Sequence, residues 1–200
     1  KWTVETAWSR YADGEPYWAS RFRGQIIKIC KDTRTSLQGG IKVDLREACR
    51  VLETWDGRSR AESRGYLLWS YFWKELPNAK ATGAGQEQNS IVGPGPIKDI
   101  FVDRLDLDNP YNTPSSVDTS RSYLVTDALG RTILAFKNQG IPLNVSVAEG
   151  QSIVINGRRF ALPGCQRSDG CENVQAGSQY GVIREATQEK YSCGHITAVF

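Results

Sequence analysis

The chain has 200 residues, a length that suits one compact domain or two small ones. Hydrophobic residues make up 40% and charged residues 24%, which excludes an intrinsically disordered protein. The net charge is only +3, and its 25 basic residues are interleaved with 22 acidic ones, which argues against a nucleic-acid-binding protein. No stretch approaches the roughly 18 consecutive apolar residues of a membrane span, so none is expected.

The first segment, residues 1–87, is expected to be mainly helical. Residues 2–18 predict two short helices on either side of the turn DGEP, and RFRGQIIKICKD (21–32) predicts another helix. TRTSLQGG (33–40) is interpreted as a loop because a pair of glycines is a strong turn signal. The apolar spacing of KVDLREACRVLETW (42–55) then predicts an amphipathic helix.

Turn and capping residues flank this amphipathic helix. Asp44 is expected to begin it, and Gly57 suits the left-handed conformation that follows a helix end. Ser59 and Glu62 in SRAE have the spacing of a capping box, which predicts the start of a second helix over SRGYLLWSYFWKEL (63–76). The aromatic residues of this helix are interpreted as core, in preference to a ligand pocket, because they recur at helical spacing.

The remainder of the chain is expected to change from helix to strand. Residues 88–148 predict a long Gly/Pro-rich loop followed by one helix, at about Thr119 to Asn138. Residues 149–200 are expected to be β-rich, because Asn156-Gly157 between two β-like runs is a strong hairpin signal. The predicted fold class is therefore α+β, with a helical N-terminal part followed by a hairpin and strand part.

The last residues, CGHITAVF (193–200), form an apolar run without a closing turn. We interpret this run as a strand that needs further pairing, which suggests that the 200 residues are a piece of a longer protein.

Two expected disulfides among the five cysteines point to an oxidising compartment, and hence to a periplasmic or secreted protein. Cys165 and Cys171 flank the polar loop QRSDG, which favours a disulfide between them over two buried thiols. Cys30 and Cys49 form a plausible second bridge, and Cys193 is then left free. Zinc is not expected, because the spacing of its usual Cys and His ligands is missing.

No residue can be assigned to catalysis, to a metal or to a cofactor. The single histidine, His195, lies in the apolar terminal run and is interpreted as a strand residue, not a general base. The carboxylates of DRLDLDN (103–109) could supply oxygen ligands for calcium, but they lack EF-hand spacing. They are interpreted as solvated loop residues or ion-pair partners.

Three segments of the chain resemble the β subunit of the penicillin acylase family. ACRVLETWDGRSRAESRGYLLWSYFW (48–73) has its Ala-Cys, Leu-x-x-Trp-Asp and Ser-Arg-Gly-x-Leu pattern. DLDNPYNTPSS (106–116) and GIPLNVSVAEGQSIVINGRRFALPG (140–164) follow in the family's order. The resemblance covers the chain from about Arg21 onward and is closest to the acyl-homoserine-lactone and aculeacin acylases.

This resemblance implies a portion of the αββα body of an N-terminal nucleophile hydrolase. In that family a serine at the start of the β subunit, exposed by self-cleavage, attacks an amide carbonyl with its own α-amino group as base. A backbone N–H and an asparagine hold the oxyanion. None of these groups maps onto this chain, which begins with Lys1, so the resemblance implies an internal scaffold portion that is inactive alone.

The implied substrate is an acyl side-chain amide, such as an acyl-homoserine lactone, a lipopeptide or a β-lactam. The implied partner is the remainder of the acylase, and no cofactor is expected. An alternative is a non-catalytic binding module that holds an apolar acyl chain or a protein partner on the aromatic helix or the Gly/Pro loop.

The residues that carry the resemblance are expected to form a structural motif. Trp55, Trp69, Phe72 and Trp73 should pack the predicted helices against each other or against the sheet, and Gly65 belongs to the same motif. Asp56, Ser63 and Arg64 are expected to fix the turn between the helices by capping, and by a buried ion pair between Arg64 and Asp56.

Overall fold

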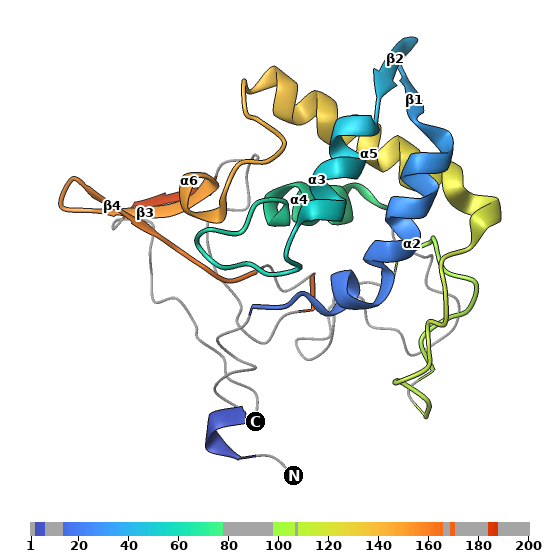
Figure 1. The fold of residues 1–200 in the computed structure, drawn as a ribbon, viewed down its shortest axis with the longest axis horizontal. Coiled ribbons are helices and arrows are strands. Elements are labelled where there is room, and N and C mark those ends of the chain that lie inside the picture. The colour runs from blue at the N-terminus through green and yellow to red at the C-terminus, as the bar shows by residue number, and fades with distance from the viewer. Residues whose placement is uncertain are drawn as a thin grey trace, which may run out of the picture.

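The computed structural model shows a helical body with a small sheet at one side (Figure 1). The residues that it describes are 3–6, 14–77, 98–106, 108–165, 169–170 and 184–187. Helices dominate the first part of the chain, interrupted by one short hairpin, and a three-stranded sheet follows, so the predicted α+β class is confirmed. Among the helices of these residues, none has both the length and the apolar character needed to cross a membrane.

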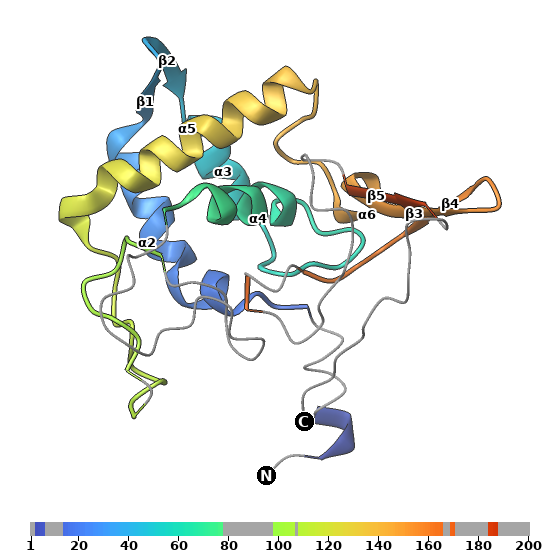
Figure 2. The same cartoon turned by 180° about the vertical axis from the view of Figure 1, so that it is seen from behind.

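Packed helices make up the body. They are α2 (Tyr17–Thr33), α3 (Arg46–Thr54), α4 (Tyr66–Glu75) and α5 (Ser122–Asn138), the last preceded by the 3-10 turn η1 (Thr119–Arg121). α2 is continuous across the boundary between Trp18 and Arg21, where two separate helices were predicted. Gly24, which was expected to weaken the helix, lies within it, and a Cβ there would contact nothing within 4 Å. α5 confirms the helix predicted near Thr119 to Asn138, and Figure 2 shows it lying across α4.

Aromatic side chains fill the centre of this body. Trp18 of α2 stacks on Trp73 of α4 with ring centroids 5.6 Å apart, and Trp73 stacks on Trp69 at 5.4 Å. Trp69 in turn lies 6.0 Å from Trp55, just after α3. All four rings are at most 3% exposed, so the core interpretation of the aromatic helix is confirmed.

The interpretation of residues 33–40 as a loop is partly wrong, because a β-hairpin begins within them. β1 (Thr35–Gln38) pairs antiparallel with β2 (Ile41–Asp44), and Gly39 and Gly40 between them both have positive φ. A glycine pair is therefore the two-residue turn of a hairpin here. The strands lie on α5, where Ser36 and Gln38 hydrogen-bond to Asp127.

The helix that follows this hairpin begins later in the chain than predicted. Because Ile41–Asp44 is a strand, α3 begins at Arg46 and not near residue 42. Asp44 lies at the end of β2, where its Oδ1 accepts a hydrogen bond from the Arg46 backbone N–H. Gly57 has the predicted left-handed conformation, with φ +77°.

The sheet contains the predicted second hairpin. β3 (Gln151–Ile155) pairs antiparallel with β4 (Arg158–Ala161) across the Asn156-Gly157 turn. β5 (Arg184–Thr187) pairs parallel with β3, which gives the order β4-β3-β5. The short helix α6 (Val147–Gly150) leads into β3. The terminal run 193–200 lies outside the described residues.

Candidate functional site

The strongest family resemblance falls on a helix–turn–helix that consists of α3, residues 55–65 and α4. Trp55 is held at its centre, where its indole Nε1 donates to the Arg58 carbonyl at 2.8 Å. The Arg23 guanidinium lies 5.3 Å from the Trp55 ring and donates to the Trp55 carbonyl at 2.8 Å. Gly65 precedes α4 at φ +123°, directly against Trp55. The close approach of Gly65 to Trp55 therefore fixes where α4 begins.

Asp56 bridges the two sides of this turn. Its Oδ1 accepts from the Arg58 backbone N–H at 3.0 Å, and its Oδ2 accepts from the Ser63 hydroxyl at 2.8 Å. Both bonds link parts of the turn, so Asp56 and Ser63 cross-brace it and do not cap the helix that follows. Ser63 is buried, and its hydroxyl has a hydrogen-bond partner in Asp56.

Arg64 does not pair with Asp56, and that expectation was wrong. Its guanidinium donates to Glu149 at 3.2 Å and to the Asn144 carbonyl at 3.0 Å. The Arg64 and Glu149 side chains are 53% and 58% exposed, so this is a surface pair. Asp56 is already engaged with Arg58 and Ser63, whereas Arg64 lies in an antiparallel bridge beside residue 146.

Arg64 therefore connects the helical body to the segment that enters the sheet. The Val147 N–H donates to the Ser63 carbonyl at 3.1 Å in the same place. Glu149 and Ser146 form a capping box at the start of α6. The Ser146 hydroxyl and backbone N–H, and then Arg64, hold the pKa of Glu149 below its usual value.

Ser59 is a junction of three chain segments, not the helix cap that was predicted. Its backbone N–H and its hydroxyl both donate to the Gly14 carbonyl at 2.9 Å. Its own carbonyl accepts from the Gly164 N–H at 3.0 Å. The predicted capping box at Ser59 and Glu62 is wrong, because α4 begins only at Tyr66.

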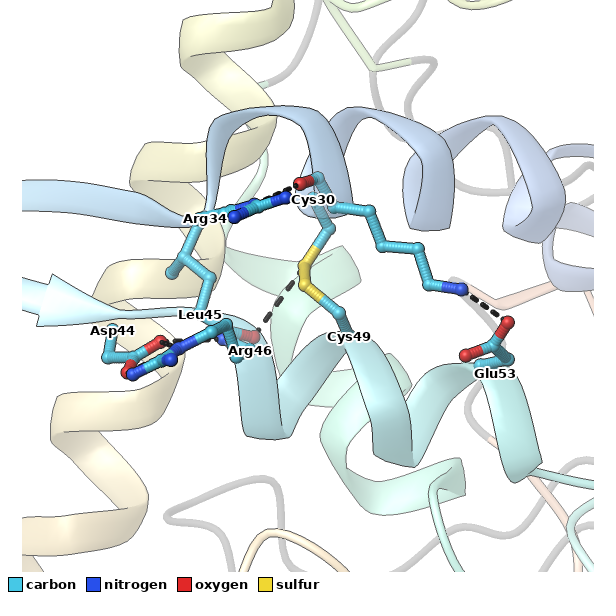
Figure 3. Close-up of a disulfide and its surroundings, with 8 residues drawn as sticks. Cys30, Arg34, Asp44, Leu45, Arg46, Cys49 and Glu53 are labelled. Carbon is cyan, nitrogen blue, oxygen red and sulfur yellow. Dashed lines mark hydrogen bonds and ion pairs between the residues drawn. A yellow bond between two sulfur atoms is a disulfide. The ribbon is translucent and has the colours of Figure 1, made fainter.

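A buried disulfide joins α2 to α3 (Figure 3). Cys30 and Cys49 are bonded, with Cα atoms 5.8 Å apart, which confirms that pairing. Figure 3 also shows the Arg34 N–H donating to the Cys30 carbonyl at the end of α2. Cys165 is disulfide-bonded too. Cys171 and Cys193 lie outside the described residues, so the Cys165–Cys171 pairing stays a prediction.

A cluster of polar side chains lies buried at α4, and the sequence patterns did not reveal it. The Tyr66 hydroxyl donates to Asp169 Oδ2 at 2.8 Å, and both residues are completely buried. Lys98 is 6% exposed and donates to the Leu76 carbonyl at 3.0 Å. Burial lowers the pKa of Lys98 to about 8, although the carboxylates of Asp169 and Glu75 oppose this shift.

A perturbed lysine in such a cluster has two possible meanings. A buried amine with a lowered pKa can hold or transfer a proton at a catalytic site. Here Lys98 donates to a backbone carbonyl at the end of α4, and the nearby Tyr66–Asp169 hydrogen bond lies in the core. These contacts attach the segments at 98 and 169 to α4. We therefore assign a structural role to the cluster.

Two carboxylates of the acidic loop 103–109, those of Asp103 and Asp106, accept hydrogen bonds from nearby residues. Asp103 accepts from the Ser115 N–H at 2.7 Å and from its hydroxyl at 2.9 Å, and Asp106 accepts from the Asp108 N–H at 2.9 Å. The Ser115 N–H is the main cause of a lowered Asp103 pKa. Within the described part of the chain, no three His, Cys, Asp or Glu residues are grouped to hold a metal ion. His195 lies outside that part.

The sequence profile of one family, described as penicillin amidase, matches residues 1–192. The match spans nearly the whole chain, and the chain belongs to the penicillin amidase family. No curated protein matches the sequence.

Proposed function

We propose that the chain is the scaffold portion of an acylase that hydrolyses an acyl side-chain amide. The family match over residues 1–192 is the observation that carries this proposal. In this reading the nucleophilic serine, its terminal amine and the oxyanion-binding groups are contributed by the remainder of the acylase, which is the partner of this chain. The αββα body of the family is the expected setting for them.

The contacts of the resemblance residues support the scaffold role. Trp55 and Gly65 set the junction of two helices, and Asp56 and Ser63 brace the turn between them. Arg64 links that turn to the segment before the sheet. Each of these residues contacts another part of the same chain, which is what a structural motif requires.

The substrate class follows from the narrower resemblance to acyl-homoserine-lactone and aculeacin acylases. We propose an acyl-homoserine lactone or a lipopeptide as substrate, with β-lactams as the other class of amide. The Cys30–Cys49 disulfide and the disulfide-bonded Cys165 support a periplasmic or secreted location, because disulfides persist in oxidising compartments.

The binding-module alternative gains no support from the aromatic helix. The α4 side chains Trp69 and Trp73, which would hold an acyl chain, are at most 1% exposed. They contact one another and the rings of Trp18 and Trp55.

The experiment is a hydrolysis assay on the protein from its native source. The protein is incubated with an acyl-homoserine lactone, an acylated lipopeptide and a β-lactam, and both products are measured by mass spectrometry. We expect the free acid and the free amine in equal amounts from at least one substrate. Binding of a substrate without release of either product would overturn the proposal in favour of a binding module.

A variant separates scaffold from catalysis in the same assay. Ser63→Ala removes the brace to Asp56 and should lower the melting temperature. It should leave kcat/KM per folded molecule unchanged, because a scaffold residue acts through stability. A large loss of kcat/KM in fully folded protein would show that the turn takes part in the reaction.

A further inference from the structure

We propose that Asn156-Gly157, at the tip of the β3–β4 hairpin, is a site of spontaneous covalent modification by deamidation. The hairpin points away from the helical body (Figures 1 and 2). The proposal concerns the chemistry of the turn itself and is independent of the acylase assignment.

The reaction needs no partner other than water. The backbone nitrogen of Gly157 attacks Cγ of the Asn156 side chain and loses its proton. The new C–N bond closes a five-membered succinimide ring, while the bond from Cγ to Nδ2 breaks and ammonia leaves. Water then opens the ring at one of its two carbonyls, which gives aspartate or isoaspartate. A glycine favours the attack because it has no Cβ to hinder the approach.

The surroundings of the turn leave both reacting groups accessible. Asn156 and Gly157 are exposed, and a Cβ on Gly157 would meet nothing within 4 Å. No described residue hydrogen-bonds the Asn156 side chain. The positive φ angles of Asn156 and Gly157, 49° and 75°, hold a tight turn that must relax before the ring can close.

The hairpin is built in a way that permits this relaxation. β4 pairs with β3 over four residue pairs only, and Arg158, Arg159 and Phe160 are all exposed. A short outer strand with little buried surface opens locally at low cost in free energy. Opening of the hairpin therefore gives the turn access to the ring-closing geometry.

Aspartate before glycine can form the same succinimide ring, and at two Asp-Gly pairs of this chain hydrogen bonds restrain the aspartate side chain. The Asp56 carboxylate is held by the Arg58 N–H and the Ser63 hydroxyl. The Asp169 carboxyl group accepts from Tyr66 in the core. Both side chains are fixed by hydrogen bonds, whereas no described residue holds the Asn156 side chain. The third Asp-Gly pair, Asp13-Gly14, begins at a residue outside the described part of the chain.

Isoaspartate at this position would alter the hairpin. It adds one methylene group to the main chain within a turn that joins the Ile155–Arg158 pair. A two-residue turn sets the register of a hairpin, so a longer main chain weakens the pairing of β3 with β4.

One tryptic peptide provides the test and its controls. Cleavage after Lys137 and Arg158 releases residues 138–158, which contain Asn138, Asn144 and Asn156, all exposed. They differ in the residue that follows, which is Gln, Val and Gly respectively. Fragment-ion masses assign any deamidation to one of the three positions, because each conversion adds about 1 Da.

The native protein is incubated at mildly alkaline pH, both folded and in urea, and digested at intervals. In the folded protein we expect deamidation at Asn156 with Asn138 and Asn144 unchanged, and the product should accept methyl groups from an isoaspartyl methyltransferase. The proposal is overturned if Asn156 in the folded protein survives unchanged for the time in which the unfolded chain is fully converted at that position.

Discussion

A Cβ atom on Gly65 would lie 2.6 Å from Cβ and 2.7 Å from Cγ of Trp55. Gly65 also has φ +123°, a conformation that side-chain-bearing residues avoid. We therefore expect Gly65→Ala to lower the free energy of unfolding by about 3 kcal/mol, from backbone strain and overpacking together. Denaturant unfolding followed by tryptophan fluorescence measures this.

Gly24→Ala is the matched control for that substitution. Gly24 lies inside α2 with nothing within 4 Å of an added Cβ. The change should stabilise the protein by about 0.5–1 kcal/mol, because alanine favours a helix interior over glycine. Equal effects of the two substitutions would contradict the close Gly65–Trp55 packing.

The disulfide between α2 and α3 should contribute directly to stability. The bond closes a loop between residues 19 apart in sequence, which corresponds to about 3 kcal/mol of lost entropy in the unfolded chain. Replacing Cys30 and Cys49 together by alanine should lower the free energy of unfolding by about that amount. An unchanged denaturation midpoint would show that the bond does not constrain the unfolded chain.

The buried Tyr66–Asp169 hydrogen bond is testable with two tyrosines of the same helix. Tyr66→Phe removes the donor to a fully buried carboxyl group and should cost about 2 kcal/mol of stability. Tyr71→Phe is the control, because no described residue hydrogen-bonds the Tyr71 hydroxyl, and the change should cost about 0.5 kcal/mol or less. A small loss for Tyr66→Phe would argue against the hydrogen bond.

Lys98 should make stability depend on alkaline pH. Burial lowers its pKa from 10.5 to about 8 in the folded protein, so between these values the unfolded chain binds the extra proton. Raising the pH through this window therefore stabilises the folded state, by about 1.4 kcal/mol per pH unit at most. Below the window the full cost of burying the charge is present.

The comparison with Lys98→Met isolates this effect from other groups that titrate in the same range. The stability of the native protein relative to the variant should rise as the pH increases from about 8 toward 10.5. A difference between the two proteins that stays constant with pH would refute the lowered pKa of Lys98.

The surface contact between Arg64 and Glu149 calls for a double-mutant cycle. Since both side chains are more than half exposed, alanine substitutions should give a coupling energy of about 0.5 kcal/mol. In the same cycle for Arg64 and Asp56, the effects of the two alanine substitutions on stability should add within about 0.3 kcal/mol, because no contact joins these side chains. Coupling between Arg64 and Asp56 with none between Arg64 and Glu149 would instead support an ion pair between Arg64 and Asp56.

Local signals in the sequence predicted the elements with strong patterns. Asn156-Gly157 marked the β3–β4 hairpin, and helical spacing marked α4 and α5. Gly39-Gly40 carried an equally usable signal for the first hairpin, but it was interpreted only as a loop. The short strands beside it hide their pattern, because Ser36 and Gln38 face Asp127 of α5 with polar groups.

Long-range contacts account for what the sequence could not reveal. Ser59 and Gly14 are 45 residues apart in sequence, and Tyr66 and Asp169 are 103 apart. Such partners are brought together only by the packing of the whole chain. The local Ser-x-x-Glu spacing at Ser59 therefore suggested a capping box, although Ser59 is engaged by the distant Gly14. Ser146 and Glu149 form a true one, because a helical turn follows them directly.

The most direct test of the scaffold proposal is intact mass with N-terminal sequencing of the protein from its native source. The account predicts a larger protein that is processed into two chains, one of which begins with serine and contains residues 1–192 internally. A mature product that consists of residues 1–200 alone, with no chain that begins with serine, would contradict the proposal that these residues support the catalytic centre of an acylase.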